Sequence, residues 1–297
     1  MNTQALASSG GSAPRDSGLA YVCFTHVPLT VDYPAYVQPL FLGSAQHDGV
    51  LNLRDVAPEW EKWHPILGSL AGVFAWRKHV LQHRPHASQV GICQYRKFVS
   101  NRRLSRTTAP SYRVMDVAAS SDLTTSLLDS AMRPRSGWLL PRPLRLDSQR
   151  RGDDFIQQYG RVHHLPDFLR FTAEAVEHKL LDAAEVRPFF VEKALLPGGL
   201  ELGVYPAPFW LETVGKLEEI VRSCVQRFPI DHVGYNARAW GFCAERLGSY
   251  VVMRRLRGPS TRGPSPIGRI WNSAGLPRRD VGHLNLISDD LSDYRIG

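Results

Sequence analysis

A helical segment that leads through a short loop into a buried strand constrains the fold of this chain more than any other feature. From 67 to 83, apolar residues recur at three-to-four spacing, and Pro65 lies just before them, where a helix start tolerates proline. Arg84-Pro85 should end this helix, and the apolar run 90–93 has the length of a strand. Such a unit is typical of a parallel or mixed sheet covered by helices. We therefore predict an α/β fold.

Similar patterns predict the remaining elements of this sheet and its helices. Strands are expected at 19–25, 37–43, 137–141 and 200–205, and helices at 121–132, 168–181, 208–228 and 235–256. Asp167 is expected to cap the helix that begins at Phe168. Cys23 and Cys93 lie in apolar runs and should be buried, and the absence of any CxxC pair suits a reducing compartment.

The domain organisation follows from composition along the chain. Residues 1–18 are rich in Ser, Gly and Ala and are expected to form a disordered leader, before a single domain at 19–256. Gly, Pro, Ser and Arg dominate 257–269, so 257–297 is expected to be a flexible basic tail. No apolar run approaches the roughly 18–20 residues of a membrane span. The few isolated cysteines suit a reducing cytoplasm, so a cytoplasmic protein is expected.

The charge is strongly positive and unevenly distributed. The net charge is +8 and the pI is about 9.5. Between Lys62 and Met115 there is no Asp or Glu, but there are ten Lys and Arg residues. Such a field attracts polyanions, namely nucleic acid, anionic membrane or phosphorylated substrates. A merely solvated basic face is the alternative.

Two strand ends carry candidate ligand-binding residues. The strand at 90–93 runs into Tyr95, Arg96 and Lys97, and cations at the carboxyl end of a strand suit a phosphate. His26 follows the strand at 19–25 and could contact a nucleotide at the same edge. The alternatives are a solvated basic loop and a loop-packing histidine.

The helix at 235–256 offers a candidate catalytic carboxylate. At 100° per residue, its core face should comprise Trp240, Cys243, Ala244, Leu247 and Val251. Glu245 lies off this face, so it is either solvated or directed into a cleft. A carboxylate facing a cationic cleft would be a candidate general base, whereas a surface glutamate paired with arginine is the alternative.

Metal-binding motifs are not evident. The adjacent His163 and His164 lack a spacing such as HExxH, so no metal ligand is assigned. The chain has no Asp-x-Asp, and the adjacent carboxylates of Asp153-Asp154 would point to opposite faces of a strand. Walker A, GxGxxG and GxSxG motifs are also absent.

Several segments in order resemble a bacterial family of capsular and exopolysaccharide glycosyltransferases, long catalogued as a domain of unknown function. The segments that carry this resemblance are Val22-Cys23-Phe24-Thr25-His26, Pro39-Leu40-Phe41-Leu42-Gly43, the helix around Ser69–Lys78, Gly91–Val99, Tyr159–Phe168, and Arg238, Gly241, Glu245, Arg246 and Leu247. The chain departs from the family at Gln94, where the family has histidine, at Ser69, where it has glutamate, and at Lys97, where it has arginine.

The resemblance implies a GT-A-like, Rossmann-like mixed sheet flanked by helices, and a nucleotide-sugar donor. On this hypothesis His26, Tyr95, Arg96 and Lys97 bind the donor and its phosphates, and Glu245 is the base. The residues assigned to the acceptor or the cleft are Tyr159, His163, His164 and Arg238.

The acceptor would be a polysaccharide or lipid-linked sugar, with peripheral contact to an anionic inner membrane. A divalent cation, Mg²⁺ or Mn²⁺, is left open because no Asp-x-Asp is present to hold it. Two alternatives stay open: a basic nucleic-acid-binding protein, which no recognised motif supports, and an inactive relative that acts in assembly at the membrane face.

Overall fold

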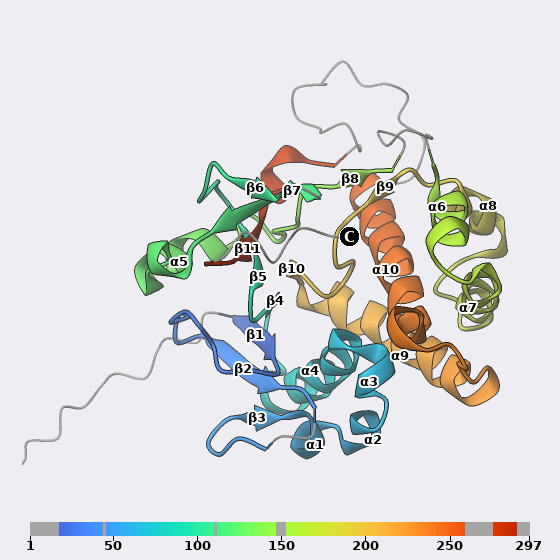
Figure 1. Ribbon diagram of the computed structural model, residues 1–297, viewed down its shortest axis with the longest axis horizontal. Helices are drawn as coiled ribbons and strands as arrows, with labels where there is room; N and C mark the ends of the chain where they lie inside the picture. Colours follow the sequence, from blue (N-terminus) through green and yellow to red (C-terminus); the bar gives the residue numbers. More distant parts are fainter. Residues whose placement is uncertain (1–17, 44–45, 110–111, 147–152, 259–275, 290–297) are drawn as a thin grey trace, which may run out of the picture.

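The computed structural model describes residues 18–43, 46–109, 112–146, 153–258 and 276–289. Nine strands of these segments form one mixed sheet (Figure 1). Its spatial order is β3 (Leu51–Asn52), β2 (Val37–Phe41), β1 (Leu19–Thr25), β4 (Gln89–Gln94), β5 (Lys97–Ser100), β11 (His283–Ile287), β7 (Tyr112–Ala118) and β6 (Thr108–Ala109), with β10 (Gly203–Pro206) also paired to β4. Strands β8 (Leu144–Arg145) and β9 (Ala194–Leu195) pair separately.

The sheet combines parallel and antiparallel strands, and both of its faces are buried. Strands β3, β2, β1 and β4 are parallel, β5 is antiparallel to β4, and β11 and β7 run parallel to each other. On β1, Ala20, Val22 and Phe24 pack on one face while Tyr21 and Cys23 pack on the other. Both faces of the sheet are therefore buried, as expected for strands with continuous apolar sequence.

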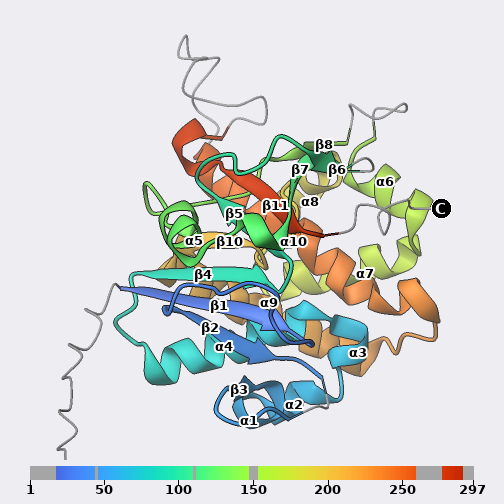
Figure 2. The ribbon, with the colours of Figure 1, turned by 60° about the vertical axis from the view of Figure 1, so that its left-hand side comes forward.

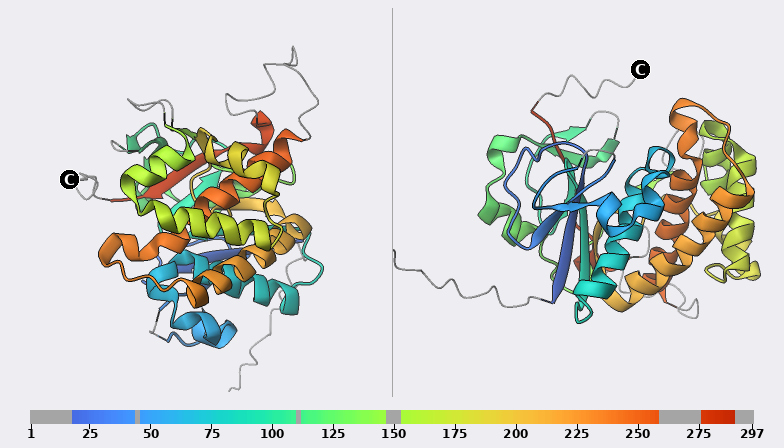
Figure 3. Two further views of the ribbon diagram at one scale, coloured as in Figure 1. Left: turned by 90° about the vertical axis from the view of Figure 1, so that its right-hand side faces the viewer. Right: turned by 90° about the horizontal axis from the view of Figure 1, so that it is seen from below.

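Helices cover the sheet unequally (Figure 3). Helix α5 (Thr125–Met132) lies on one face, and α4 (Ser69–His83) and α9 (Ala207–Arg227) lie on the other. Helix α10 (Ala239–Arg257) packs against α9, and α7 (Leu165–Glu177) contacts both of them. Helix α6 (Phe155–Val162) packs on α7 and on α8 (Val186–Phe190) at the outer side of this layer. Short helical turns complete the fold: α1 (Leu53–Val56), α2 (Pro58–Glu61), α3 (His64–Leu67), η1 (Ser120–Asp122), η2 (Ala183–Glu185), η3 (Gly234–Arg238) and η4 (Arg278–Asp280).

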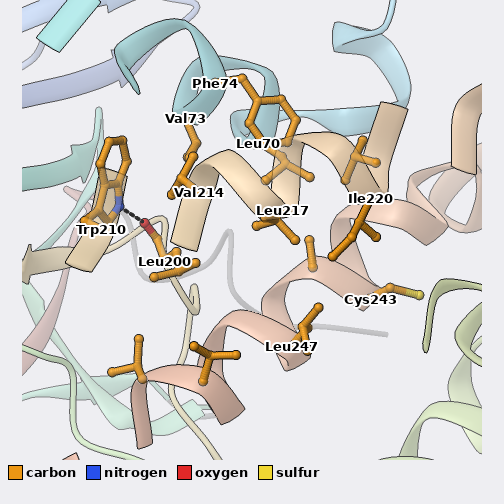
Figure 4. Close-up of a cluster of buried hydrophobic side chains, with 14 of the residues drawn as sticks. Leu70, Val73, Phe74, Leu200, Trp210, Val214, Leu217, Ile220, Cys243 and Leu247 are labelled. Atoms are coloured by element: carbon orange, nitrogen blue, oxygen red, sulfur yellow. Dashed lines mark hydrogen bonds between the residues drawn. The ribbon is translucent and has the colours of Figure 1, made fainter. Parts of the chain in front are cut away.

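The interface of α4, α9 and α10 is the apolar centre of this helical layer (Figure 4). Leu217 of α9 lies between Leu70 of α4 and Leu247 of α10, and all three are buried. Trp210 is also buried, and its indole N–H donates to the carbonyl oxygen of Leu200 at 3.2 Å. This packing fixes α10, which carries Glu245, against α9.

Most predicted elements are confirmed, and the α/β fold with a mixed sheet flanked by helices is present. Strand β1 has the predicted bounds, and the buried face of α10 contains the five predicted core residues. Cys23 and Cys93 are buried and unpaired. The segment 137–141 was predicted as a strand, but it makes only isolated bridges at Leu139 and Leu140.

The predicted flexible tail is wrong for its described part (Figure 2). Strand β11 lies inside the sheet, antiparallel to β5 and parallel to β7. Asn285 of this strand is fully buried and its amide donates to Ser100 Oγ at 2.8 Å. The predicted leader and most of the tail fall on 1–17, 259–275 and 290–297, outside the described residues. Within the described ranges, no helix is long and apolar enough to span a bilayer.

Candidate functional site

A cavity of about 490 Å³ opens at the carboxyl end of β4. We call it the basic cavity, because three cationic residues line it: Arg96, Lys97 and Arg238. Its carboxylates are Glu201 and Glu245. Arg96 and Lys97 come from the β4–β5 hairpin, and Glu201 comes from the segment before β10. Arg238 ends η3, and Glu245 lies within α10. The structure thus gathers four of the residues predicted from the sequence, together with Glu201, which was not predicted.

The β4–β5 hairpin positions the cations. Gln94 pairs with Lys97, so Tyr95 and Arg96 form the connection, and the Tyr95 N–H donates to the carbonyl of Phe24 at 2.8 Å. This places the Lys97 side chain at the cavity wall. Desolvation lowers the pKa of Lys97, and the nearby Glu245 carboxylate opposes that effect. A cation here is close to an acidic partner and shielded from water.

Glu245 lies between two cavities. Its Oε1 accepts a hydrogen bond from the backbone N–H of Gly198 at 2.7 Å. Gly199 has a φ of 54°, and a Cβ there would come within 2.6 Å of the carbonyl oxygen of Glu245, so only glycine fits. A second cavity of about 500 Å³ shares Tyr235, Phe242 and Glu245 with the basic cavity. The prediction that Glu245 faces a cationic cleft is consistent with this arrangement.

Glu201 is the functional candidate that the sequence analysis missed. Burial raises its pKa to about 8, despite a hydrogen bond donated by Ser69 Oγ that favours the charged form. Gln94 in turn donates from Nε2 to Ser69 Oγ at 3.3 Å. Two of the three positions at which the chain departs from the resembled family, Ser69 and Gln94, are therefore in contact and join Glu201 in one hydrogen-bonded chain. A single glutamate between Leu200 and Leu202 in an apolar segment was the available signal.

His26 and Tyr95 lie beside the basic cavity and do not line it. Their rings meet edge to face, with centroids 4.8 Å apart, and His26 is exposed. The Arg96 guanidinium lies 5.2 Å from the centre of the Tyr95 ring. Through Arg96, the aromatic pair forms a rim next to the cavity.

The residues predicted for the acceptor side separate into two groups. Tyr159 is fully buried and stacks on Phe168 at 4.7 Å, so its predicted place in a cleft is wrong; the aromatic packing of α6 on α7 holds it in the core. His163 stacks on Phe242 at 4.3 Å and lines the second cavity. Burial lowers the pKa of His163, which favours its neutral form.

His164 belongs to a different cluster. Helix α7 begins at Leu165, so His164 occupies the N-cap position and Asp167 lies in the first turn. The prediction that Asp167 caps this helix is therefore wrong. The Asp167 carboxylate is buried between His164 and His232, and the three side chains could hold a metal ion. The sequence assigns no metal ligand here because His163 and His164 lack a spacing such as HExxH, and the third member of the cluster, His232, is distant along the chain.

Comparison with known proteins identifies a similar fold. No family model and no curated protein matches the chain. A solved structure described as the WbbM bifunctional glycosyltransferase, in its apo form, superimposes with a TM-score of 0.68 at 14% sequence identity. The match covers 91% of this chain and 45% of that protein, so the chain spans less than half of its length. The chain thus has an α/β fold, a mixed sheet flanked by helices, that matches a glycosyltransferase structure.

Proposed function

We propose that this chain is a glycosyltransferase that moves a sugar from a nucleotide-sugar donor to a polysaccharide or lipid-linked acceptor in surface polysaccharide synthesis. The observation that carries the proposal is the position of Glu245 on the wall shared by the basic cavity and the second cavity. A transferase that activates its acceptor with a general base needs that base between the site of its phosphorylated donor and the site of its acceptor. The fold similarity to a glycosyltransferase and the motif resemblance support the same conclusion.

The basic cavity suits the donor. Arg96, Lys97 and Arg238 can meet the charge of a diphosphate, which grows as the sugar–phosphate bond breaks. The rim of His26 and Tyr95 offers aromatic surface for the base of the nucleotide. Glu201 repels a bound diphosphate only weakly, because its raised pKa keeps most of its carboxyl groups protonated and neutral near pH 7.

The second cavity suits the acceptor. An acceptor hydroxyl beside Glu245 would lose its proton to the carboxylate as its oxygen bonds to the sugar carbon and the diphosphate leaves. His163 and Phe242 line this cavity and offer ring faces to a sugar. Glu245 then takes the proton, the acceptor oxygen takes the sugar, and the cations of the basic cavity stabilise the leaving diphosphate.

The side chains of the basic cavity that could ligate a metal do not suit Mg²⁺ or Mn²⁺. Such ions prefer ionised oxygen ligands. Glu201 favours its neutral form and accepts from Ser69, while Glu245 accepts from Gly198 and lies near Lys97. These groups therefore do not form a site for a divalent ion.

Acidic partners from other segments reduce the case for nucleic-acid binding. Arg77 pairs with Glu218, and Lys78 pairs with Glu59. Arg103 pairs with Asp116 at 3.1 Å. These pairs neutralise part of the acid-free stretch. Contact of the remaining cations with an anionic membrane, on the cytoplasmic side, stays part of the proposal.

The test combines binding with turnover. Nucleoside diphosphates and their sugars are screened by thermal shift, since a ligand that binds only the folded state raises the melting temperature. Arg96→Ala should lose the shift, and Arg102→Ala, which removes an arginine bonded to Ser130 outside the cavity, should keep it. Glu245→Gln should keep the shift and lower transfer by about 100- to 10,000-fold.

Two results would contradict the proposal. The donor site fails if no nucleotide shifts wild type. The role of Glu245 fails if its glutamine variant transfers sugar at the normal rate. Salt-dependent binding of arbitrary DNA, with no nucleotide response, would favour the nucleic-acid alternative. Nucleotide binding without turnover in wild type would favour an assembly role.

A further inference from the structure

One cluster of side chains outside the cavities already described has the composition of a metal centre. His164 Nδ1 lies 3.2 Å from Asp167 Oδ2, and His232 Nε2 lies 2.9 Å from the same oxygen. All three ligand atoms lie within 4.8 Å of one another. None of the three residues lines the basic cavity or the second cavity. The cluster therefore needs an explanation of its own.

The spacing suits a tetrahedral ion. Metal–ligand bonds of about 2.0–2.1 Å at the tetrahedral angle separate neighbouring ligand atoms by about 3.3 Å. The two distances to Asp167 Oδ2 are close to this value, so a small rotation of the imidazole rings would complete the triangle. Two imidazoles and one carboxylate leave a fourth position for water.

The surroundings support the ligands. Asp167 is only 1% exposed, so its carboxylate is held in place, and Arg170 approaches its other oxygen at 3.6 Å. Such contacts orient a ligating carboxylate. His164 and His232 both border an open hollow, which gives an ion a route from solvent.

The local charge does not exclude a cation. Arg170 and Arg227 line the same hollow as the cluster, and Arg227 is paired with Glu174 at 2.6 Å. Arg161 borders His164 and His232 on another side and is paired with Asp153. Asp231 lies beside His232, with 3.5 Å between Oδ1 and Nδ1, and is almost fully exposed. Each of these arginines thus has a carboxylate partner, and Asp231 adds a further negative charge.

We propose that His164, Asp167 and His232 bind one borderline divalent transition-metal ion, for which Zn²⁺ is the best fit. Imidazole ligands suit Zn²⁺, whereas Mg²⁺ prefers an octahedral shell of oxygens. The ion would join the first turn of α7 to the segment that follows α9. Because η3 begins two residues after His232 and carries Tyr235 and Arg238, the ion would also fix the residues that close the cavities.

The site is tested with the full-length chain, without a histidine tag, after treatment with chelator. Calorimetric titration with Zn²⁺ should give one site per chain, and Zn²⁺ should raise the melting temperature. His164→Ala and His232→Ala should each weaken binding at least about 100-fold, because each removes one of three protein ligands. X-ray absorption of the zinc complex should show only nitrogen and oxygen ligands at about 2.0–2.1 Å.

Two matched controls make the test specific. His283 resembles His232 in exposure, 24% against 23%, and contacts the buried Asp116 at 3.1 Å, but has no second imidazole in its cluster. His79 and His83 lie one turn apart on α4 and offer two imidazoles in contact with each other. His283→Ala and the double variant His79→Ala/His83→Ala should both bind Zn²⁺ like wild type.

Three results would overturn the proposal: no Zn²⁺ binding by wild type, equal binding by folded His232→Ala, or loss of the site in the His79/His83 variant. Tighter binding of Mg²⁺ than of Zn²⁺ would also contradict the assigned ligand chemistry. Circular dichroism of each variant establishes that it is folded. None of these readouts depends on transferase activity, so the metal site and the proposed function can fail separately.

Discussion

The buried carboxyl group of Glu201 should make the stability of this protein depend on pH. Its pKa is raised from an ordinary value of 4.5 to about 8 in the folded chain, chiefly by burial. The folded state therefore binds a proton that the unfolded state releases between these values. Stability from this group is fully present below pH 4.5 and is lost as the pH rises through 8.

The size of the effect follows from the same values. At about 1.4 kcal/mol per pH unit, a rise from 4.5 to about 8 corresponds to a loss of at most about 5 kcal/mol. Relaxation and water penetration reduce such burial penalties, so we expect about 2–3 kcal/mol to be observed. Glu201→Gln keeps the shape and removes the titration, and it should abolish this part of the pH dependence.

Urea denaturation at pH 5.5 and pH 9 measures the effect. The free energy of unfolding of wild type should fall between these pH values by about 2–3 kcal/mol more than that of Glu201→Gln. Ser69→Ala removes the hydrogen bond that favours the charged carboxylate, so it should move the transition to higher pH. Equal pH dependence in wild type and Glu201→Gln would refute the reasoning.

Two substitutions test the packing around the site. Gly91→Ala should destabilise the chain by about 3 kcal/mol or more in thermal or urea unfolding, because a Cβ would overlap the ring of Tyr21. Gly137→Ala is the control and should change stability little, because the atom nearest to its added Cβ is 3.6 Å away. Near-normal stability of Gly91→Ala would show that Tyr21 can move aside. Leu217→Ala should cost about 2–5 kcal/mol, since Leu217 is 1% exposed between three helices, whereas Leu169→Ala, at 43% exposure, should cost far less. Equal costs for the two leucines would contradict the packing argument.

The local sequence pattern was sufficient to predict an element wherever that element buries a regular face. Strand β1 is a continuous apolar run and has its predicted bounds. The spacing of Trp240, Cys243 and Leu247 identified the buried face of α10, and therefore placed Glu245 off it. Periodicity succeeds here because side-chain direction follows directly from position along a helix or strand.

Pattern failed where the decisive partner is distant in sequence. Strand β11 lies beyond a Gly- and Pro-rich segment, and its partners β5 and β7 lie more than 160 residues earlier. Tyr159 has the polar hydroxyl of a site residue, but α7 and α10 together bury it. Composition describes neighbours along the chain, whereas burial depends on neighbours in space.

The sequence by itself determined the α/β class, the cationic end of β4 and the off-core position of Glu245. Only the tertiary structure brought Glu201 to Ser69 and Gln94, placed Glu245 between two cavities, and joined His164 and Asp167 to His232. The physical reason is that a site depends on distances and dielectric environment, which arise when separate segments pack together. Residue type supplies the chemistry, and packing decides which groups can act on one another.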